Sequence, residues 1–370
     1  MSEKYDNQIT KEDKEFLKNV GVDLESKERS ATFTIVNNDV SEIDVNEEAA
    51  IELLSLQKAK EKHPWLKEYL WTLIDRDRDK WTKIAAENEA NGYFIRVKKG
   101  RKVDYPLQAC FYIKMQRFVQ AVHNVIIIEE GAHLDIINGC ATASYVTTGA
   151  HYGITEIFVK EGGYLSYNMI HDWGEEVEVR PRTAIRVEKN GTFISNYVAL
   201  ESTKITQSYP VAHLVGENSV AKFTSLVYAP VGATYDLGAK IILDAENAKG
   251  EIISRTISGG GRIVSRGYLL GAKPKIHAHL ECSGMILKEG GSLYTIPELE
   301  ALVDDVEMSH EAAVGKIAEE ELEYLMSRGL TEEQATTLIV KGFLDTKIMG
   351  LPPELEKQME NAINSLENAF

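Results

Sequence analysis

A turn signal that returns about every 29 residues constrains this chain more than any other feature, because a period of this length is typical of one structural unit stacked on copies of itself. The turns are Glu130-Gly131, Glu161-Gly162-Gly163, Lys189-Asn190-Gly191, Glu217-Asn218-Ser219, Glu246-Asn247-Ala248 and Glu289-Gly290-Gly291. The first five follow one another at nearly equal intervals. The last interval is longer and contains Gly259-Gly260-Gly261, which we interpret as a coil corner.

The segments between the turns are short apolar runs with strand character. Val125–Ile128 precedes the first turn and Leu134–Ile137 follows it. Such runs are four to six residues long, β-branched and bounded by glycine or asparagine, and no helical pattern interrupts them. The pattern therefore favours a mainly β chain in which a parallel β-helix buries the apolar face of each coil on the next. An ordinary antiparallel sandwich is the alternative that the pattern leaves open.

The segments on either side of the repeat carry helical patterns. We predict a mainly helical N-terminal region at residues 1–90, the β-helix core at 91–305 and a C-terminal helical domain at 306–370. Helix starts are expected at Thr10, at about Ala49, at the Thr331–Gln334 capping box and at Pro352-Pro353.

Composition and charge exclude several classes of function. The formal net charge of −16 argues against a nucleic-acid partner. The first residues are charged and polar, and no apolar run approaches the roughly 18 residues that span a bilayer, so we expect a cytoplasmic protein without a signal peptide or membrane span. The three cysteines, Cys110, Cys140 and Cys282, have no C-x-x-C spacing, so neither a disulfide framework nor a structural zinc site is expected.

Several catalytic motifs are missing from the sequence. It contains no G-x-x-x-x-G-K-[ST] phosphate loop, no G-x-G-x-x-G at a strand–helix junction, no G-x-S-x-G and no H-E-x-x-H. The chain is therefore not expected to hydrolyse ATP itself or to be an enzyme of the hydrolase or dehydrogenase classes.

One group of residues has the chemistry of a metal site. Cys282 lies in the last coils, and Ser309-His310-Glu311 follows it after about one period, so the two segments could be stacked neighbours. A thiolate, an imidazole and a carboxylate can bind iron or an iron–sulfur cluster, and a thiolate can carry sulfur as a persulfide. The plainer interpretation is a buried inert cysteine and a surface His–Glu pair. His171-Asp172-Trp173 is an unusual cluster for a coil edge but is no motif by itself.

The C-terminal block resembles the SufB/SufD family, the scaffold subunits of the SUF system of iron–sulfur cluster assembly. The matching text begins with Val306-Glu307-Met308-Ser309-His310-Glu311-Ala312-Ala313-Val314-Gly315-Lys316-Ile317 and continues through Glu321–Leu330 to Gly342-Phe343. Pro106-Leu107-Gln108 and Gly139-Cys140 are similar to earlier segments of the family. The resemblance covers roughly residues 90–345.

This resemblance implies a right-handed parallel β-helix with helical N- and C-terminal domains, working with a SufC-type ABC ATPase. Cys282 and Glu311 stand at the positions of the sulfur-accepting cysteine and the essential glutamate of the SufB branch. His310 matches a histidine that the SufD branch contributes across the scaffold interface. A chain that carries both sets is expected to form a homodimer, or to pair with a related scaffold subunit.

The resemblance also implies a sulfur-transfer route through the β-helix. Cys140 matches a cysteine along that route, and Trp173 is kept from it. His171 and Arg182 stand at two further positions of the route but differ from the residues of the family there, as do Tyr112 and Lys114.

Taken together, these features predict a SufB-like scaffold that is not itself an enzyme and that carries a transient iron–sulfur cluster on Cys282, Glu311 and His310. Its further partners would be a sulfur donor and apo-protein acceptors. Two alternatives belong to other classes: a SufD-like structural subunit that holds the ATPase without a cluster, and a polysaccharide-active β-helix enzyme. The coils carry no evident acidic cluster of the kind that such an enzyme needs.

Overall fold

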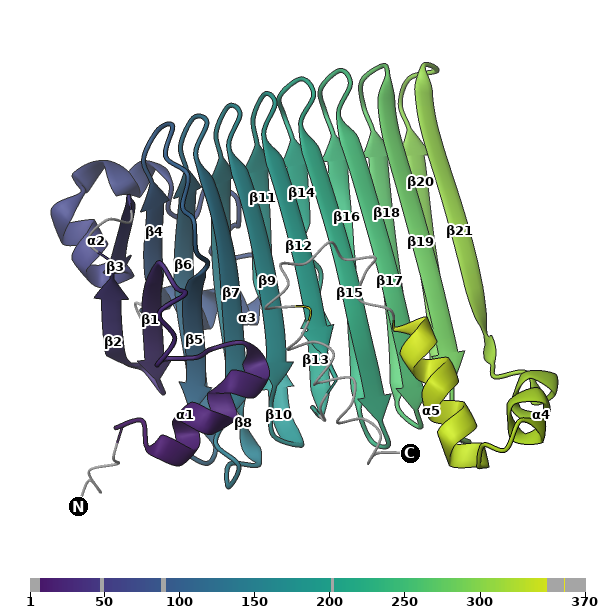
Figure 1. Cartoon of the computed structure of the whole chain (residues 1–370). Coiled ribbons are helices and arrows are strands. Elements are labelled where there is room, and N and C mark those ends of the chain that lie inside the picture. The colour runs from purple at the N-terminus through teal and green to yellow at the C-terminus, as the bar shows by residue number, and fades with distance from the viewer. Residues whose placement is uncertain (1–6, 47–49, 88–90, 201–202, 345–355, 357–370) are drawn as a thin grey trace.

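Two long β-sheets face each other along the whole molecule and are joined coil by coil into a solenoid (Figure 1). The computed structural model describes residues 7–46, 50–87, 91–200, 203–344 and 356. Each coil supplies strands to both sheets, and successive coils pair in parallel. The prediction of a mainly β chain built as a parallel β-helix is confirmed.

Sheet A contains, in order, β2 (Asp39–Val45), β1 (Ala31–Val36), β5 (Leu107–Ile113), β7 (His133–Thr142), β9 (Tyr164–Asp172), β12 (Thr192–Ala199), β15 (Val220–Pro230), β17 (Lys249–Gly259), β19 (Ile276–Ile286) and β21 (Val306–Lys316). Sheet B contains β3 (Ile51–Ser55), β4 (Tyr93–Val97), β6 (Phe118–Ile128), β8 (Thr148–Val159), the short strands β10 (Glu176–Val179), β11 (Arg182–Val187), β13 (Ile205–Ser208) and β14 (Val211–Leu214), then β16 (Thr234–Leu243), β18 (Arg262–Gly271) and β20 (Ser292–Ala301).

The repeated turns form a stacked column where each strand of sheet B leads into the next strand of sheet A. Their central residues all have positive φ, which glycine and asparagine adopt most easily: Gly131, Gly162, Asn190, Asn218 and Asn247. The backbone N–H of the first four donates to a carbonyl one coil further on, over 2.8–3.1 Å. The period of the sequence is therefore the repeat of this corner.

The next member of the column is neither glycine nor asparagine, so the sequence pattern did not reveal it. It is Lys275, which has φ +58° and whose N–H donates to Asp305 O at 2.6 Å. Gly290 lies instead at the opposite corner, between β19 and β20, as Gly260 does between β17 and β18. The long interval before Gly290 in the sequence therefore ran from a residue at one corner to a residue at the opposite corner. Measured at one corner, the coil length stays nearly constant.

The sequence predicted a mainly helical N-terminal region, but the structure shows short helices interspersed with strands there. Its helices are short: α1 (Lys11–Leu17), η1 (Lys18–Val20), α2 (Leu56–Lys62), η2 (Pro64–Glu68) and α3 (Lys80–Glu87). Strands β1, β2 and β3 lie among them and extend both sheets. The helix start at Thr10 is confirmed, since this residue caps α1 in a capping box with Asp13.

The helix predicted from about Ala49 begins later. Ile51–Ser55 is strand β3, antiparallel to β4, and α2 starts at Leu56 with Ser55 as its cap. Ile51 pairs with Val97, so a partner distant in sequence decides the conformation of this segment.

The C-terminal helices are α4 (Glu319–Ser327) and α5 (Glu332–Phe343). The helical domain was expected from residue 306, but Val306–Lys316 is strand β21. The Thr331–Gln334 capping box at the start of α5 is confirmed. The helix expected at Pro352-Pro353 lies outside the described residues.

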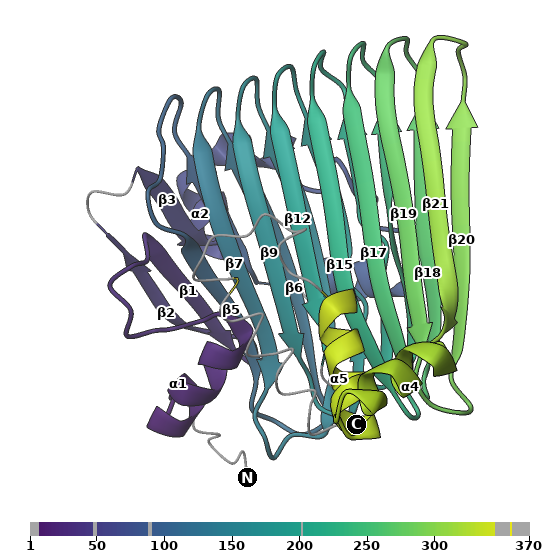
Figure 2. The ribbon, with the colours of Figure 1, turned by 45° about the vertical axis from the view of Figure 1, so that its right-hand side comes forward.

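Helices cover parts of the outer faces of both sheets (Figures 1 and 2). Helix α5 lies on the outer face of sheet A, where Val340 and Leu344 are buried and Arg255 of β17 donates to Phe343 O at 2.7 Å. At the other end Val20 and Val22 pack over Gly139 of β7, where a β-carbon would come within 2.6 Å of Val22. No helix among the described residues combines the length and apolar character needed to cross a membrane.

Candidate functional site

Cys282 ends a file of interior side chains that runs along sheet A. The strand registers align Met169, Tyr197, Ser225, Ser254 and Cys282 on β9, β12, β15, β17 and β19. Because side chains alternate between the two faces of a strand, aligned residues of neighbouring strands share a face. Cys282 is 1% exposed, which identifies this face as the interior of the solenoid.

Hydroxyl groups connect this file to Cys282. Ser225 Oγ donates to Ser254 Oγ at 3.3 Å, and Ser254 Oγ is 2.9 Å from Ser265 Oγ of β18. Ser265 in turn hydrogen-bonds to Cys282. A narrow interior cavity of ≈ 50 Å³ lies between Tyr197 and Ser254, which leaves space for a few water-sized molecules.

The Cys282 thiol is neutral at physiological pH. Burial raises its pKa to about 11, although the hydrogen bond with Ser265 works in the opposite direction. The thiolate that binds metal or attacks sulfur is therefore a minor species until a positive charge arrives.

His310 lies on the same inner face, one strand further on. It is aligned with Leu280, two residues before Cys282, across the β19–β21 pair. Its Nε2 atom is buried and has no hydrogen-bond partner. An unpartnered buried ring nitrogen is costly, and a ligand that it could bind would remove the cost.

Glu311 points to the other side of β21. Cys282 is aligned with Ala312 and Glu281 with Glu311, so the two glutamates share the outer face. Aligned residues of β19 and β21 are 30 positions apart in the sequence. Cys282 and Glu311 are one position closer than that, and a slip of one residue exchanges the faces of a strand. The structure thus brings Cys282 and His310 to one face but not Glu311.

Cys140 and its neighbours occupy the interior near the first coils. Cys140 is aligned with His171, whose Nδ1 is 3.1 Å from Tyr197 Oη. The rings of His171 and Trp173 are 5.7 Å apart, and His171 Nε2 and Trp173 Nε1 are buried without hydrogen-bond partners. Burial raises the pKa of Cys140 well above its usual value, and lowers the pKa of His171 to about 3 with help from His151.

Comparisons with known proteins agree with the resemblance of the C-terminal block to the SufBD family. The family model described as "SUF system FeS cluster assembly, SufBD core domain" matches residues 111–343. A protein of Archaeoglobus fulgidus named iron-sulfur cluster assembly SufBD family protein is 46% identical over 355 residues, which cover 96% of this chain and 95% of that relative. The chain belongs to the SufBD family.

Further SufBD relatives share most of the chain. A protein of the same name from Methanothermobacter thermautotrophicus is 43% identical over 362 residues, covering 96% of this chain and 88% of its own length. One from Pyrococcus horikoshii is 33% identical over 313 residues, with coverages of 84% and 70%. The SufBD core match contains every residue of the candidate site, from Cys140 to Glu311.

Arg182 is separated from the interior file of this SufBD chain. Its Nε donates to Asp79 Oδ2 at 2.7 Å, and its guanidinium carbon lies 4.8 Å from the centre of the Trp81 ring. Asp79 and Trp81 belong to the segment that covers the outer face of sheet B near α3. Arg182 therefore holds this cover in place and does not line the interior near Cys140.

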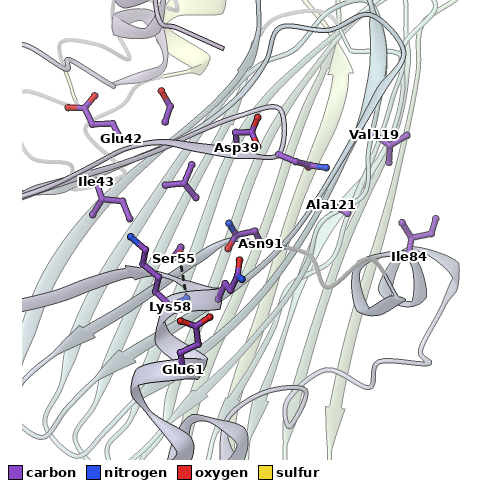
Figure 3. Close-up of a pocket in the computed structure, with 14 residues that line it drawn as sticks. Asp39, Glu42, Ile43, Ser55, Lys58, Glu61, Ile84, Asn91, Val119 and Ala121 are labelled. Atoms are coloured by element: carbon purple, nitrogen blue, oxygen red, sulfur yellow. Dashed lines mark hydrogen bonds between the residues drawn. The ribbon is translucent and has the colours of Figure 1, made fainter. Parts of the chain in front are cut away.

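The wide groove of ≈ 1200 Å³ at the N-terminal end is a different feature (Figure 3). It lies between the β1–β2 hairpin and α2, and its lining includes Asp39, Glu42, Lys58 and Glu61. Its described lining residues include no cysteine or histidine, so they offer no thiolate to carry sulfur and no imidazole to bind a metal.

The serines of the file were missed in the sequence, although a signal was present. Counting back from Cys282 by one, two and three coils reaches Ser254, Ser225 and Tyr197. The same period that predicted the fold would have predicted the interior neighbours of Cys282.

No ready metal-binding group is present in the described ranges. Within them, no three histidine, cysteine or carboxylate side chains converge as a metal ion requires. Cys282 and His310 share one inner face, two candidate metal ligands from neighbouring strands.

Proposed function

We propose that this SufBD chain is a scaffold on which a nascent iron–sulfur cluster is built at the C-terminal end of the solenoid. The observation that carries the proposal is the presence of the Cys282 thiol and the unpartnered His310 Nε2 on the same inner face of the last two strands of sheet A. Thiolate and imidazole are both established ligands of iron–sulfur clusters.

Iron would activate Cys282 as it binds. A ligating thiol must lose its proton, so metal binding is coupled to deprotonation and releases the proton to solvent. The raised pKa of Cys282 keeps the thiol unreactive until then. Glu311, exposed on the outer face, would offer a hard oxygen ligand to incoming iron.

Sulfur is proposed to reach Cys282 through the interior. Cys140 and Cys282 are separated by five inter-strand steps of about 4.8 Å, or roughly 24 Å, which is too far for direct exchange between the two sulfur atoms. Only a small mobile sulfur species could use the file, with His171, Trp173 and Tyr197 at its entrance and the serines before Cys282.

The partner ATPase of the SufC type is proposed to dock on α4 and the outer side of α5. Tyr324, Met326 and Leu338 are exposed apolar residues there, whereas Val340 on the inner side of α5 is buried. Replacing the three exposed residues by serine should abolish co-purification with the ATPase without changing the fold; binding that persists in this variant would contradict the assignment.

A second copy of the chain is proposed to cover the last coil. Strands β20 and β21 end their sheets (Figure 2). Exposed apolar side chains lie on them and on the turn between them: Tyr294, Ile296, Leu299, Leu302 and Val314. An uncovered apolar sheet edge favours association. The sulfur donor and apo-protein acceptors of a cytoplasmic assembly pathway would complete the partner set.

Anaerobic reconstitution with ferrous iron and sulfide tests the cluster directly. The wild-type chain should gain visible charge-transfer absorbance with bound iron and acid-labile sulfide, and Cys282→Ser should gain neither. Cys110→Ala is the matched control, because Cys110 is equally buried but is aligned with Gly139 on the outer face of sheet A. Normal cluster content in Cys282→Ser, or none in the wild type, would contradict the proposal and favour a structural, SufD-like role.

A further inference from the structure

The outer face of β19 carries a second group of metal-ligating residues that the proposed cluster site does not use. His277 and His279 are two residues apart on this strand and therefore point to the same side, opposite to Cys282. Strand β21 places Glu307 beside His277 and Ser309 beside His279. A groove of ≈ 440 Å³ runs over these residues. The starts of β19 and β21 lie at the ends of these strands away from α5 (Figure 2).

Two contacts already link the strands in this group. His277 Nδ1 is 2.9 Å from Glu307 Oε2, and His279 Nδ1 is 2.8 Å from Ser309 Oγ. In both rings the Nδ1 atom faces β21. His277 is more than half exposed (56% of its side chain), so its ring can turn at little cost.

We propose that His277, His279 and Glu307 form a surface site for a divalent transition-metal ion such as Fe²⁺. Two imidazoles on one strand and a carboxylate from the next strand make a two-histidine, one-carboxylate set with open positions, a ligand combination typical of non-haem Fe²⁺. In their present rotamers the three side chains do not converge on one point, so His279 has to leave Ser309 and turn towards His277 and Glu307 when the metal binds.

The surrounding charges are nearly balanced. Glu251 is aligned with His279 on the other side, but its carboxylate is engaged by Lys222 at 2.8 Å. Lys249 is aligned with His277, and its side chain is exposed to solvent, where it can turn away from an arriving cation. Glu311 lies four residues beyond Glu307 on the same face, so a further acidic oxygen ligand follows along β21 in the direction of α4.

Cobalt(II) titration of the metal-free Cys282→Ser chain tests the site. Without Cys282 the cluster site cannot contribute, so the outcome does not depend on the proposed function. One equivalent should bind and give d–d absorbance without a sulfur charge-transfer band. His277→Ala and His279→Ala should each weaken binding by more than about tenfold, since loss of even an outer-sphere partner of a ligand costs about 10–100-fold.

The chain offers a matched control for these variants. His213 contacts Asp244 at 3.2 Å in another exposed His–carboxylate pair, without a second histidine two residues away. His213→Ala should bind cobalt as the parent does. Unchanged affinity in both His277→Ala and His279→Ala, or an equal loss in His213→Ala, would overturn the proposal.

Discussion

The two ends of the solenoid are finished in opposite ways. At the N-terminal end, the antiparallel strand β2 pairs with β1 and the antiparallel strand β3 pairs with β4, and all six residues of β1 are buried. At the C-terminal end, β20 and β21 are left at the edges of their sheets, and most of their residues are exposed. The first end is closed by the chain itself, whereas the described residues leave the second end uncovered.

Buried residues at the closed end are expected to contribute mainly to stability, whereas residues at the open end are expected to contribute mainly to function. Residues that seal the closed end, such as Phe33 and Tyr93, are 0% exposed and pack edge to face at 5.6 Å. Residues of the open end include Tyr294 and Leu302, which are 51% and 60% exposed. Cys282 and His310 lie just inside this open end. Substitutions at the two ends should therefore affect different measurements.

The largest effect on stability is expected at the closed end. Phe33→Ala removes a fully buried ring and should lower the free energy of unfolding by about 3–5 kcal/mol, measured by urea denaturation. Tyr294→Ala at the open end is the comparison and should change it by less than about 0.5 kcal/mol. Equal losses of unfolding free energy in the two variants would contradict the distinction between the closed and the open end.

A smaller effect is expected at the Asp13 cluster, which fastens α1 to sheet A. The Asp13 carboxylate accepts hydrogen bonds from Lys114 Nζ and Tyr112 Oη, both at 2.7 Å. Asp13→Asn should cost about 2 kcal/mol at neutral pH, the usual contribution of a hydrogen bond to a charged group. Glu15→Gln on the exposed side of α1 is the control and should have little effect.

The same cluster predicts a pH dependence. Burial raises the pKa of Asp13, but the bonds from Lys114, the Thr10 backbone and Tyr112 outweigh it, so the folded-state pKa is lowered. Its stabilisation is therefore complete above the unfolded pKa of about 3.9 and is lost as the pH falls through the folded value. The difference between the wild type and Asp13→Asn should shrink in acid; a constant difference would show that Asp13 does not titrate as described.

The smallest of these free-energy effects concerns association. Leu299→Lys with Leu302→Lys places charges on the exposed edge and should weaken self-association by at least about tenfold, or roughly 1.4 kcal/mol, with no loss of stability. Val231→Lys is the control, since Val231 is exposed at a corner away from this edge. Sedimentation velocity measures the change, and an unaltered mass distribution in the edge variant would argue against a dimer through β20 and β21.

The repeat could be predicted from sequence because it depends on local turn chemistry. Glycine and asparagine mark corners that need positive φ, and they give both the coil length and the fold. Lys275 adopts the same conformation without such a residue type, so that corner was invisible. Strand β3 was missed because its partner β4 lies far away in the sequence. Strand β1 forms a local hairpin with β2 around Asn37-Asn38, a signal that was present in the sequence but was missed.

The site was only partly predictable, for a reason of register. Cys282 and His310 were correctly expected on neighbouring coils, but a spacing of about one period does not decide which face of a strand a residue occupies. One additional residue in the last coil places Glu311 outside and His310 inside. Arg182 was assigned to the interior route by resemblance alone, and its partner Asp79 belongs to a covering segment that the repeat does not describe.

The central claim is that the open C-terminal end holds a cluster and is completed by a second copy of the chain. Anaerobic size-exclusion chromatography of the reconstituted protein, with simultaneous light scattering and visible absorbance, tests both parts at once. Cluster absorbance should elute with a mass of twice the 41.3 kDa chain and should be absent in Cys282→Ser. Cluster absorbance that elutes at the mass of a single chain, or that survives in Cys282→Ser, would contradict the account.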